Sequence, residues 1–374
     1  MGPISITSNR HPTASLSLDT LKFSVERKTA AERSTSRCCA PPFPFLNPFF
    51  PPLSYRHLLA MRAYLLLSAL LVCFWQTTFS QQEHRYTQFM YNKMAYNPAY
   101  AGTRGLLTGT AIYRNQWFKM EGAPRSAQVS VHAPVFSQRV GVGAVLSHHQ
   151  IGLHRDVQLT AAYAYNVING DEFSLRVGVS GNLRVLSIDF SKATPLSQYD
   201  PSLDDKRINE TVANFGTGIY GTFQERLYFG FSVPRIIRNN IGLNTEPGMR
   251  TAREEPHFYG TTGGIIPLGD EFNLMPAALV RYVHNAPIDV DLSLSLEFRR
   301  AVSLGMAYRA GGDGIGESLN VLAYWQVDPR FGVGAAYDLT ITNLRSFVGG
   351  SFELMMYADL VKRKKGMSNP RFFM

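Results

Sequence analysis

The residues most suggestive of chemistry in this sequence are histidines and aspartates that could attract a metal ion. His148 and His149 are adjacent, and His154 and Asp156 follow shortly afterwards. Because neighbouring residues of a β-strand point to opposite faces, the rings of His148 and His149 cannot bind one ion together. We therefore interpret the group as polar residues near the end of a loop and predict no metal site.

A second group, Asp200, Asp204 and Asp205, resembles a calcium-binding loop only superficially, because the alternating ligands, central glycine and distant glutamate are missing. We interpret it as a solvated external loop. The sequence contains no G-x-S-x-G, Walker, H-E-x-x-H or C-x-x-C motif, and Gly311 to Gly316 is flanked by strand patterns, which indicates a hairpin turn. We predict no enzyme and no cofactor, although a barrel enzyme with scattered rim residues stays an open alternative.

The elements that must position these polar groups are short strands. With 31 Gly, 21 Pro and only 17% charged residues, the composition suits many strands joined by turns. Fourteen candidate strands lie at 105–115, 125–134, 139–148, 154–167, 172–190, 213–223, 226–234, 256–266, 270–283, 287–299, 301–310, 317–327, 330–341 and 346–359.

The alternation within these segments predicts the fold class. In 287–299, Leu292, Leu294 and Leu296 share one face, while Asp291 and Ser293 occupy the other. Segments of about ten residues that are apolar outward and polar inward are typical of a transmembrane β-barrel. Aromatic residues near the segment ends would form its interfacial girdle: Tyr113, Trp117, Tyr165, Tyr282, Phe298, Trp325 and Tyr357. A soluble β-sandwich also alternates, but the segment lengths and the girdle favour an all-β, antiparallel transmembrane barrel of about 14 strands.

Residues 61–80 have the features of a secretory signal peptide. One Arg62 precedes an apolar run, and small residues stand at the positions that signal peptidase reads, so we expect cleavage near Ser80-Gln81. We interpret residues 1–60 as a mis-assigned upstream extension or a disordered one. Residues 1–62 carry eight of the 37 Lys and Arg and three of the 28 Asp and Glu, so the remainder has a net charge of only +4 and no sign of nucleic-acid binding. All three cysteines also precede the cleavage point.

The connections and the two ends of the barrel follow from the strand order. We predict a short periplasmic N-terminal segment at 81–104, a barrel at 105–360 and a basic C-terminal tail at 361–374. Short turns of outer-membrane barrels face the periplasm, and the long loops expected at 191–212 and 235–255 would then be external. The lumen of fourteen strands is too wide for side chains of the wall to fill, so water, a plug or a partner must occupy it. The turn-rich segment Tyr86 to Gly102 is a candidate plug or docking strip, or a simple turn-former.

Several stretches resemble the PorP/SprF family of the type IX secretion system. Within the N-terminal segment these are Gln88-Phe89-Met90-Tyr91-Asn92 and Tyr96-Asn97-Pro98-Ala99-Tyr100-Ala101-Gly102. Further along they are Tyr113-Arg114-Asn115-Gln116-Trp117, Gly122-Ala123-Pro124, His132-Ala133-Pro134, Gly230-Phe231-Ser232-Val233-Pro234 and Gly305-Met306-Ala307-Tyr308-Arg309. The family's Y-x-Y-D pattern appears here with Tyr337-Asp338, and its S-H-E pattern appears as Ser351-Phe352-Glu353, without the histidine.

The resemblance implies a non-enzymatic outer-membrane protein of the type IX secretion system in gliding bacteria and their relatives. Its partners would be outer-membrane lipid, periplasmic ring proteins of the machine, and/or the C-terminal signal domains of secreted cargo. The residues that we expect to dock a partner are Tyr96, Asn97, Pro98, Tyr100, Gly102, Arg114, Gln116 and Trp117. The alternative function is a general porin or a solute-specific outer-membrane channel.

Overall fold

A computed structural model describes residues 84–136, 139–170, 172–192, 207–241, 252–311, 316–343 and 345–360. The predicted leader with the extension before it, the aspartates at 200, 204 and 205, and the basic tail lie outside the described residues. The description below therefore concerns the barrel and the segment from His84 that precedes it.

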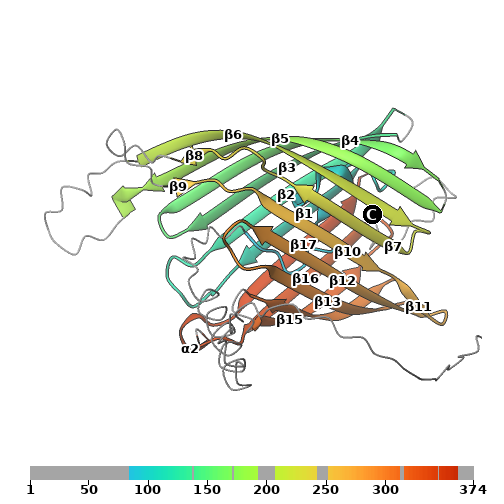
Figure 1. Ribbon diagram of the computed structural model, residues 1–374. Helices are drawn as coiled ribbons and strands as arrows, with labels where there is room; N and C mark the ends of the chain where they lie inside the picture. Colours follow the sequence, from blue (N-terminus) through green and yellow to red (C-terminus); the bar gives the residue numbers. More distant parts are fainter. Residues whose placement is uncertain are drawn as a thin grey trace, which may run out of the picture. The chain divides into compact units, whose positions relative to one another are not determined.

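Fourteen antiparallel strands in the described residues close into a barrel (Figure 1). β10 (His257–Gly264) and β11 (Ile266–Leu268) count as one of them, because both pair with β12 on either side of Ile265. The others are β1 (Thr108–Asn115), β2 (Arg125–Val135), β3 (Val140–Ile151), β4 (His154–Asn169), β5 (Phe173–Asp189), β6 (Arg207–Phe223), β7 (Leu227–Val233), β12 (Phe272–Val283), β13 (Asp289–Phe298), β14 (Val302–Ala310), β15 (Gly316–Gln326), β16 (Phe331–Thr340) and β17 (Ser351–Asp359).

Each strand pairs with its neighbours in the sequence, and the pairing of β1 with β17 closes the ring. At this closing seam Arg114 lies directly opposite Glu353, and Thr108 lies opposite Asp359. This up-and-down closure gives the strands neighbours on both sides, as a strand-built membrane protein requires. Among the described strands, the loop-end part of β6, residues 207–216, pairs with β5 alone.

The two ends of the barrel differ in their connections. At the turn end, where β1 begins and β17 ends, short turns join β2 to β3, β4 to β5, β6 to β7, β11 to β12, β13 to β14 and β15 to β16. At the opposite loop end lie the longer connections, which include a two-stranded ribbon of β8 (Asn240–Ile241) and β9 (Ala252–Arg253) and the short helix α2 (Arg345–Val348). In Figure 1 the loop end with β8, β9 and α2 is on the left and the turn end with β11 is on the right.

The strands agree with the segments predicted from the sequence, with two informative differences. β6 begins at Arg207 rather than 213, because its first outward residues, Asn209 and Thr211, are polar and give no apolar alternation. Residues 345–348 form a helical turn rather than the start of β17, and Gly349, with a φ of 68°, ends it before the strand begins.

The apolar face points outward, as predicted. In β13 the side chains of Leu292 and Leu294 are about half exposed (50% and 51%), whereas Asp291 and Ser293 are buried in the interior. Five predicted girdle residues also face outward: Tyr113, Tyr165, Tyr282, Phe298 and Trp325. Tyr357 is a correction, because it faces the lumen with its ring beneath the guanidinium of Arg104. No helix in the described part of the chain is long and apolar enough to cross a membrane.

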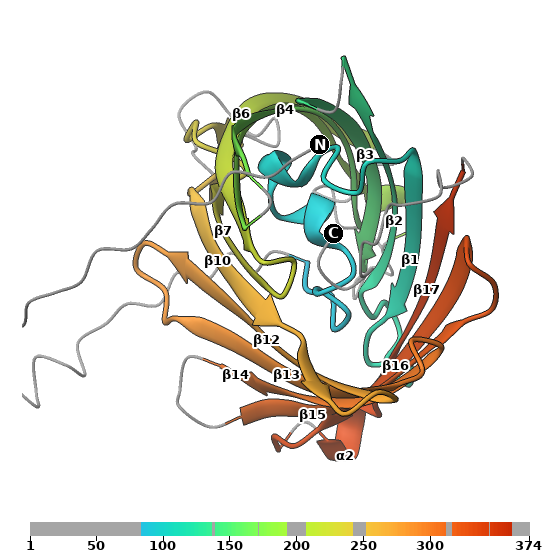
Figure 2. The same cartoon turned by 90° about the vertical axis from the view of Figure 1, so that its right-hand side faces the viewer.

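The hydrophobic core lies inside the barrel. It combines inward-facing residues of the strands with residues 84–107, which we call the plug and which contain two short helices, η1 (Lys93–Ala95) and η2 (Pro98–Tyr100). Figure 2, which views the barrel from the turn end, shows the plug in cyan within the ring of strands. From the sequence we expected a periplasmic segment before β1 and named a plug as one of its candidate roles; the structure places the segment inside the lumen.

Candidate functional site

The plug folds locally through its turn-forming residues. The Asn97 side chain accepts a hydrogen bond from the Ala99 backbone N–H (2.9 Å), and Pro98 occupies the first position of η2, so the two residues together cap that helix. The Asn97 amide also donates to the carbonyl of Ile219 on β6 (2.7 Å). Gly102 has a φ of 73°, and its N–H donates to Nδ1 of His132 (3.2 Å). The same residues therefore shape the plug and attach it to the wall.

Glycines of the wall let the plug backbone approach closely. A Cβ added to Gly178 on β5 would overlap the backbone of Ala99, and one added to Gly141 on β3 would overlap the carbonyl of Ala101. Backbone atoms cannot move aside as a flexible side chain can. This part of the lumen is therefore shaped for residues 97–102.

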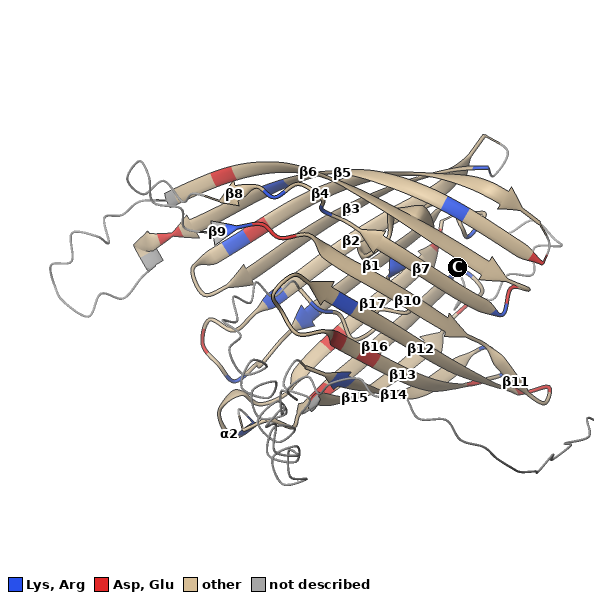
Figure 3. Cartoon of the chain, viewed as in Figure 1, with Lys and Arg blue, Asp and Glu red and all other residues tan. Residues whose placement is uncertain are grey.

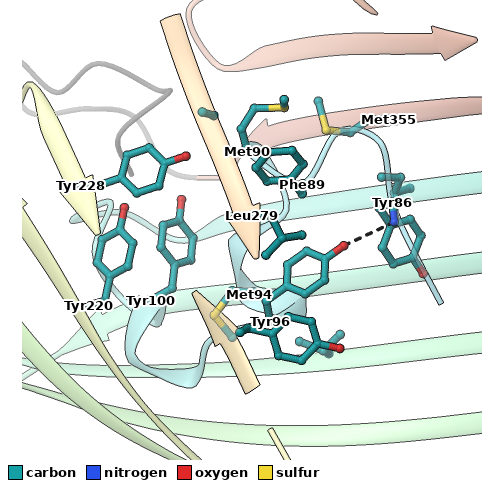
Figure 4. Close-up of a cluster of buried hydrophobic side chains, with 14 of the residues drawn as sticks. Tyr86, Phe89, Met90, Met94, Tyr96, Tyr100, Tyr220, Tyr228, Leu279 and Met355 are labelled. Carbon is teal, nitrogen blue, oxygen red and sulfur yellow. Dashed lines mark hydrogen bonds between the residues drawn. The ribbon is translucent and has the colours of Figure 1, made fainter. Parts of the chain in front are cut away.

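Aromatic residues of the plug fill the centre of the lumen (Figure 4). The Tyr96 hydroxyl accepts a hydrogen bond from the backbone N–H of Tyr86 (3.3 Å), which joins the two arms of the plug. The ring of Tyr96 lies 5.3 Å from that of Tyr259 on β10, and the ring of Tyr100 packs edge-on against Tyr220 on β6 at 5.4 Å. Ring pairs at such distances add to the gain from burying apolar area.

A cluster of charged groups holds the first arm of the plug, and we call it the clasp: Thr87, Gln88, Arg114, Asp338 and Glu353. The Glu353 carboxylate accepts the backbone N–H groups of Thr87 and Gln88, each at 2.8 Å, and a hydrogen bond from Arg114 at 3.2 Å. Asp338 accepts from the Thr87 hydroxyl at 2.8 Å and from Arg114 at 2.5 Å. All five residues are buried, so these charge-assisted bonds are poorly screened by solvent.

The clasp continues into a ladder of ion pairs along the wall. Arg309 on β14 pairs with Asp291 at 2.7 Å and approaches Asp338 at 3.6 Å, and Arg281 on β12 pairs with Asp291 at 2.8 Å. Acidic and basic residues accordingly lie close together around β13, β16 and β17 in Figure 3. Each charge of the ladder lies close to an opposite one, as the interior of a membrane protein demands.

The plug reaches both ends of the barrel. Arg85 pairs with Glu317 (2.6 Å) and Asp289 (2.7 Å), which stand at the loop ends of β15 and β13. The ring of His84 stacks on that of His149, close to the loop end of β3, with centroids 3.4 Å apart.

At the turn end, Arg104 lies 3.6 Å from Asp359, the last residue of β17. The carbonyl of Leu107 accepts from the N–H of Leu360 at 2.8 Å. The chain therefore runs from the loop end at His84 to the turn end at Leu107, where β1 begins.

A polar cavity of about 120 Å³ remains beside the plug, lined by residues that include His84, His149, Asp156, Arg184 and Glu254. Arg184 pairs with Asp156 (2.7 Å) and Glu254 (3.2 Å), so the charges of the lining are largely matched. His149 faces Asp156 across the β3–β4 pair while His148 pairs with Val157, so the two histidines point to opposite faces. Among the described residues no group of three potential ligands could hold a metal ion.

The eight residues predicted to dock a partner fall into two groups. Tyr96, Asn97, Pro98, Tyr100, Gly102 and Arg114 are buried in the lumen. Gln116 and Trp117 are half-buried in the β1–β2 connection at the loop end, where the Trp117 N–H donates to the hydroxyl of Ser351 (3.2 Å). Their role in docking stays a prediction.

Sequence reasoning missed the carboxylates of the clasp, although a signal was present. Asp338 closes the Tyr337-Asp338 pattern, and Glu353 closes Ser351-Phe352-Glu353. Both patterns were noted only for their departures from the family. Phe352, where the family pattern has histidine, lies 6.2 Å from the ring of Tyr113, which faces outward, and it takes no part in the clasp.

Comparison with solved structures returns outer-membrane proteins of low similarity. A Pseudomonas aeruginosa FadL homologue has 14% identity and a TM-score of 0.41, over 76% of this chain and 96% of that one. Omp33 of Acinetobacter baumannii has 6% identity and a TM-score of 0.40, over 68% and 96%. The toluene transporter TodX of P. putida has 7% identity and a TM-score of 0.40, over 71% and 93%. These TM-scores are too low to carry information on function.

The comparison with protein families, unlike that with solved structures, assigns the chain to a family. None of the curated proteins compared with the chain matches it significantly. The family described as type IX secretion system membrane protein PorP/SprF matches residues 78–357, which include the plug and nearly all of the barrel. The chain therefore belongs to the PorP/SprF family and is an outer-membrane β-barrel component of the type IX secretion system.

Proposed function

We propose that the chain is a non-enzymatic scaffold of the secretion system whose plugged barrel docks periplasmic ring proteins, secreted cargo, or both, as in the machinery of gliding bacteria. The observation that carries this proposal is the plug. Residues 84–107 occupy the centre of the lumen and are tied to the wall at both ends of the barrel. A barrel filled by its own chain is suited to present surfaces rather than to pass solutes.

The turn end offers such a surface. Phe136, in the β2–β3 turn, is 84% exposed, and its φ of 48° holds it in a conformation that side chains rarely adopt. Polar residues with similar φ values follow in other turns, including Gln224, Glu225, Arg299 and Arg300. If the short turns face the periplasm, as in other outer-membrane barrels, Phe136 lies on the side of the ring proteins.

A pair of exposed phenylalanines tests where docking occurs. Phe136→Ser changes the turn end, and Phe347→Ser changes a residue that is 76% exposed in α2 at the loop end. Both side chains are largely exposed, so both variants should insert normally. Secretome comparison should show cargo lost from the medium with Phe136→Ser if the ring proteins dock at the turn end. Normal export by both variants would contradict docking through these residues.

The alternative function, a general porin or solute channel, makes a different prediction. Purified protein of this kind would carry a large and stable single-channel current in a lipid bilayer. We expect no such current from the intact chain, because the plug and its clasp block the centre of the lumen. A gene-deletion secretome then gives the direct test of a secretion role, since loss of a solute channel would leave exported proteins unchanged.

A further inference from the structure

The outward face of the barrel carries, near the loop end, a row of polar residues that lie opposite one another on five neighbouring strands. We call this set the rim row: Arg125 of β2, Gln150 of β3, Arg155 of β4, Ser187 of β5 and Asn209 of β6. Val129 and Leu159 stand an even number of residues further along the strands of Arg125 and Arg155, and they are exposed on the outward face (51% and 52%). The rim row therefore presents two guanidiniums and no carboxylate on the outside of the wall.

The rim row lies where the apolar band of the barrel ends. Beyond Arg155, every outward residue of β4 from Val157 to Val167 is Val, Leu, Ala or Tyr. That stretch rises about 26 Å along the barrel axis, at about 3.4 Å per residue and a tilt of about 40°. The apolar band of outer-membrane barrels is about 25 Å tall. Arg155 therefore stands at the level of the lipid headgroups, next to the hydrocarbon layer.

The two arginines of the rim row have no counter-charge within the described part of the chain. Neither Arg125 nor Arg155 forms an ion pair with a carboxylate there. Arg238, another exposed arginine at the loop end, does pair with a carboxylate, that of Glu255 (3.1 Å). Unpaired guanidiniums at the membrane surface attract anionic headgroups, and their planar forks match a phosphate with two hydrogen bonds each. The charge of the rim row thus fits a phosphate.

A cavity of about 180 Å³ adjoins the row. It is lined by Gly122, Ala123, Arg125, Gln150 and Gly152. The N–H of Gly152 donates to the carbonyl of Gly122 (2.8 Å), which fixes the floor between two connections, and a Cβ on Gly152 would meet no atom within 4 Å. One water needs about 10–15 Å³ of such a cavity, so a phosphate group has room beside the Arg125 guanidinium.

We propose that the rim row and this cavity form a binding site for one phosphate of a lipopolysaccharide molecule. Arg125 and Arg155 stand two strands apart, about 10 Å between their Cα atoms, and their long side chains can converge on one phosphate. The amide of Gln150 lies between them and supplies a further donor. The acyl chains of the lipid lie along the apolar band, where Leu146 and Leu159 are half exposed.

The site goes beyond the docking function proposed above. It depends on that proposal for one assumption only, namely that the loop end lies in the outer leaflet, where lipopolysaccharide is found. A site of this kind holds a single lipid at one sector of the rim, β2 to β4, and so differs from the mobile lipid that surrounds any barrel.

Lipid binding by the purified, folded barrel tests the site. Protein in a phosphate-free detergent is titrated with synthetic lipid A, the phosphorylated anchor of lipopolysaccharide, and bound lipid is counted by native mass spectrometry. We expect one tightly bound lipid A per barrel. The double variant Arg125→Gln/Arg155→Gln should bind it roughly 30-fold more weakly, since each arginine near a lipid surface contributes about a fivefold factor. Both side chains lie outside the interior, so the urea midpoint of unfolding should not change.

Two controls accompany this measurement. Arg226→Gln/Arg300→Gln removes the same charge from exposed residues at the turn end, and it should bind lipid A as tightly as the unchanged chain does. Lipid A without its phosphates should bind the unchanged chain as weakly as the double variant binds the phosphorylated form. Equal affinity of the rim-row variant and the unchanged chain would overturn the proposal, and so would undiminished binding of the phosphate-free lipid.

Competition identifies the source of the phosphate. Phosphatidylglycerol and inorganic phosphate are added to the complex, each at the concentration of lipid A. Neither should displace lipid A, and displacement by either one would overturn the assignment to lipopolysaccharide. Because both ends of the barrel are open to lipid in detergent, the result does not depend on which end faces the periplasm. A failure of the site is therefore distinguishable from a failure of the proposed orientation.

Discussion

Glu353 has no exposed surface, yet its carboxylate is the point where the plug, β1 and β17 meet. Two backbone N–H groups and one guanidinium converge on it from residues more than 200 positions away in the sequence. A buried carboxylate is tolerated only when its oxygens are satisfied in this way. At the scale of single residues, Glu353 therefore connects the plug to the wall more directly than any aromatic contact does.

Replacing Glu353 by Ala should destabilise the folded barrel strongly. The change leaves the N–H groups of Thr87 and Gln88 and part of the Arg114 charge unsatisfied in the interior, and breaking a buried pair costs about 3–5 kcal/mol. Urea unfolding in detergent, followed by the mobility of the folded band on gels, measures this. Glu271→Ala, at a rim ion pair with Arg299 in which both side chains are well exposed, is the control and should cost at most about 1 kcal/mol. Equal losses would contradict the role of the clasp.

Two glycines of β5 offer a second, steric test. Gly178→Ala would place a methyl group against the backbone of Ala99, whereas Gly181→Ala meets nothing within 4 Å. Overpacking of this kind lowers the free energy of unfolding by about 1–3 kcal/mol. A substitution that meets no neighbouring atom changes it by at most about 0.5 kcal/mol. We expect trypsin to reach the plug faster in Gly178→Ala only. Similar protection of both variants would show that the plug does not seat against β5.

At the scale of elements, the sequence predicted the strands individually, whereas a plug was only one of three candidate roles for the segment before them. The alternation of apolar and polar residues along β13 and β16 predicts which face meets lipid, because this period of two residues is local to each strand. The plug has no such period: its position depends on contacts such as Thr87 with Glu353, which are separated by 266 residues. Turn residues such as Asn97 and Pro98 indicated order in the segment, but nothing local indicates that the ordered segment lies inside the barrel.

Exchange of residues 85–103, which form most of the plug, for a flexible linker should open a conducting lumen. Arg85, Lys93 and Arg104 are the charged residues of 84–107 apart from histidine, so the plug brings no carboxylate and the exchange removes the two cations Arg85 and Lys93. In the ladder, the carboxylates of Asp289, Asp291, Glu317, Asp338 and Glu353 would then face only the guanidiniums of Arg114, Arg281 and Arg309. We expect a cation-selective current when residues 85–103 are replaced by a Gly/Ser linker of equal length.

Reversal potentials in a salt gradient measure that selectivity, with the intact chain as the control. An anion-selective current would contradict the assignment of the ladder to the lumen wall. The absence of any current, with a correctly folded barrel, would mean that parts of the chain other than the plug close the lumen.

At the scale of the whole molecule, the outward apolar face determines how the barrel sits in the membrane. Leu294 is half exposed in the middle of β13, whereas Asn209 lies outward on β6 toward the loop end. Leu294→Arg should destabilise the barrel in lipid vesicles by about 2–4 kcal/mol, and Asn209→Arg by about 0–1 kcal/mol, because the cost falls with distance from the bilayer midplane. Reversible urea unfolding in vesicles tests this. If Asn209→Arg destabilises the barrel as much as Leu294→Arg does, the lipid-facing part of β6 extends closer to the loop end than its polar residues indicate.

The closing seam also has a meaning for quality control during synthesis. The first strand cannot pair with the last until the chain has been made as far as Asp359, and the partners of Thr87, Gln88 and Arg104 lie on that last strand. The clasp and Arg104 contacts of the earliest part of the mature chain therefore form only after its latest part has been made. A truncated product would leave its aromatic N-terminal segment exposed to periplasmic proteases, and so would be distinguished from a complete barrel before it could occupy a place in the secretion machine.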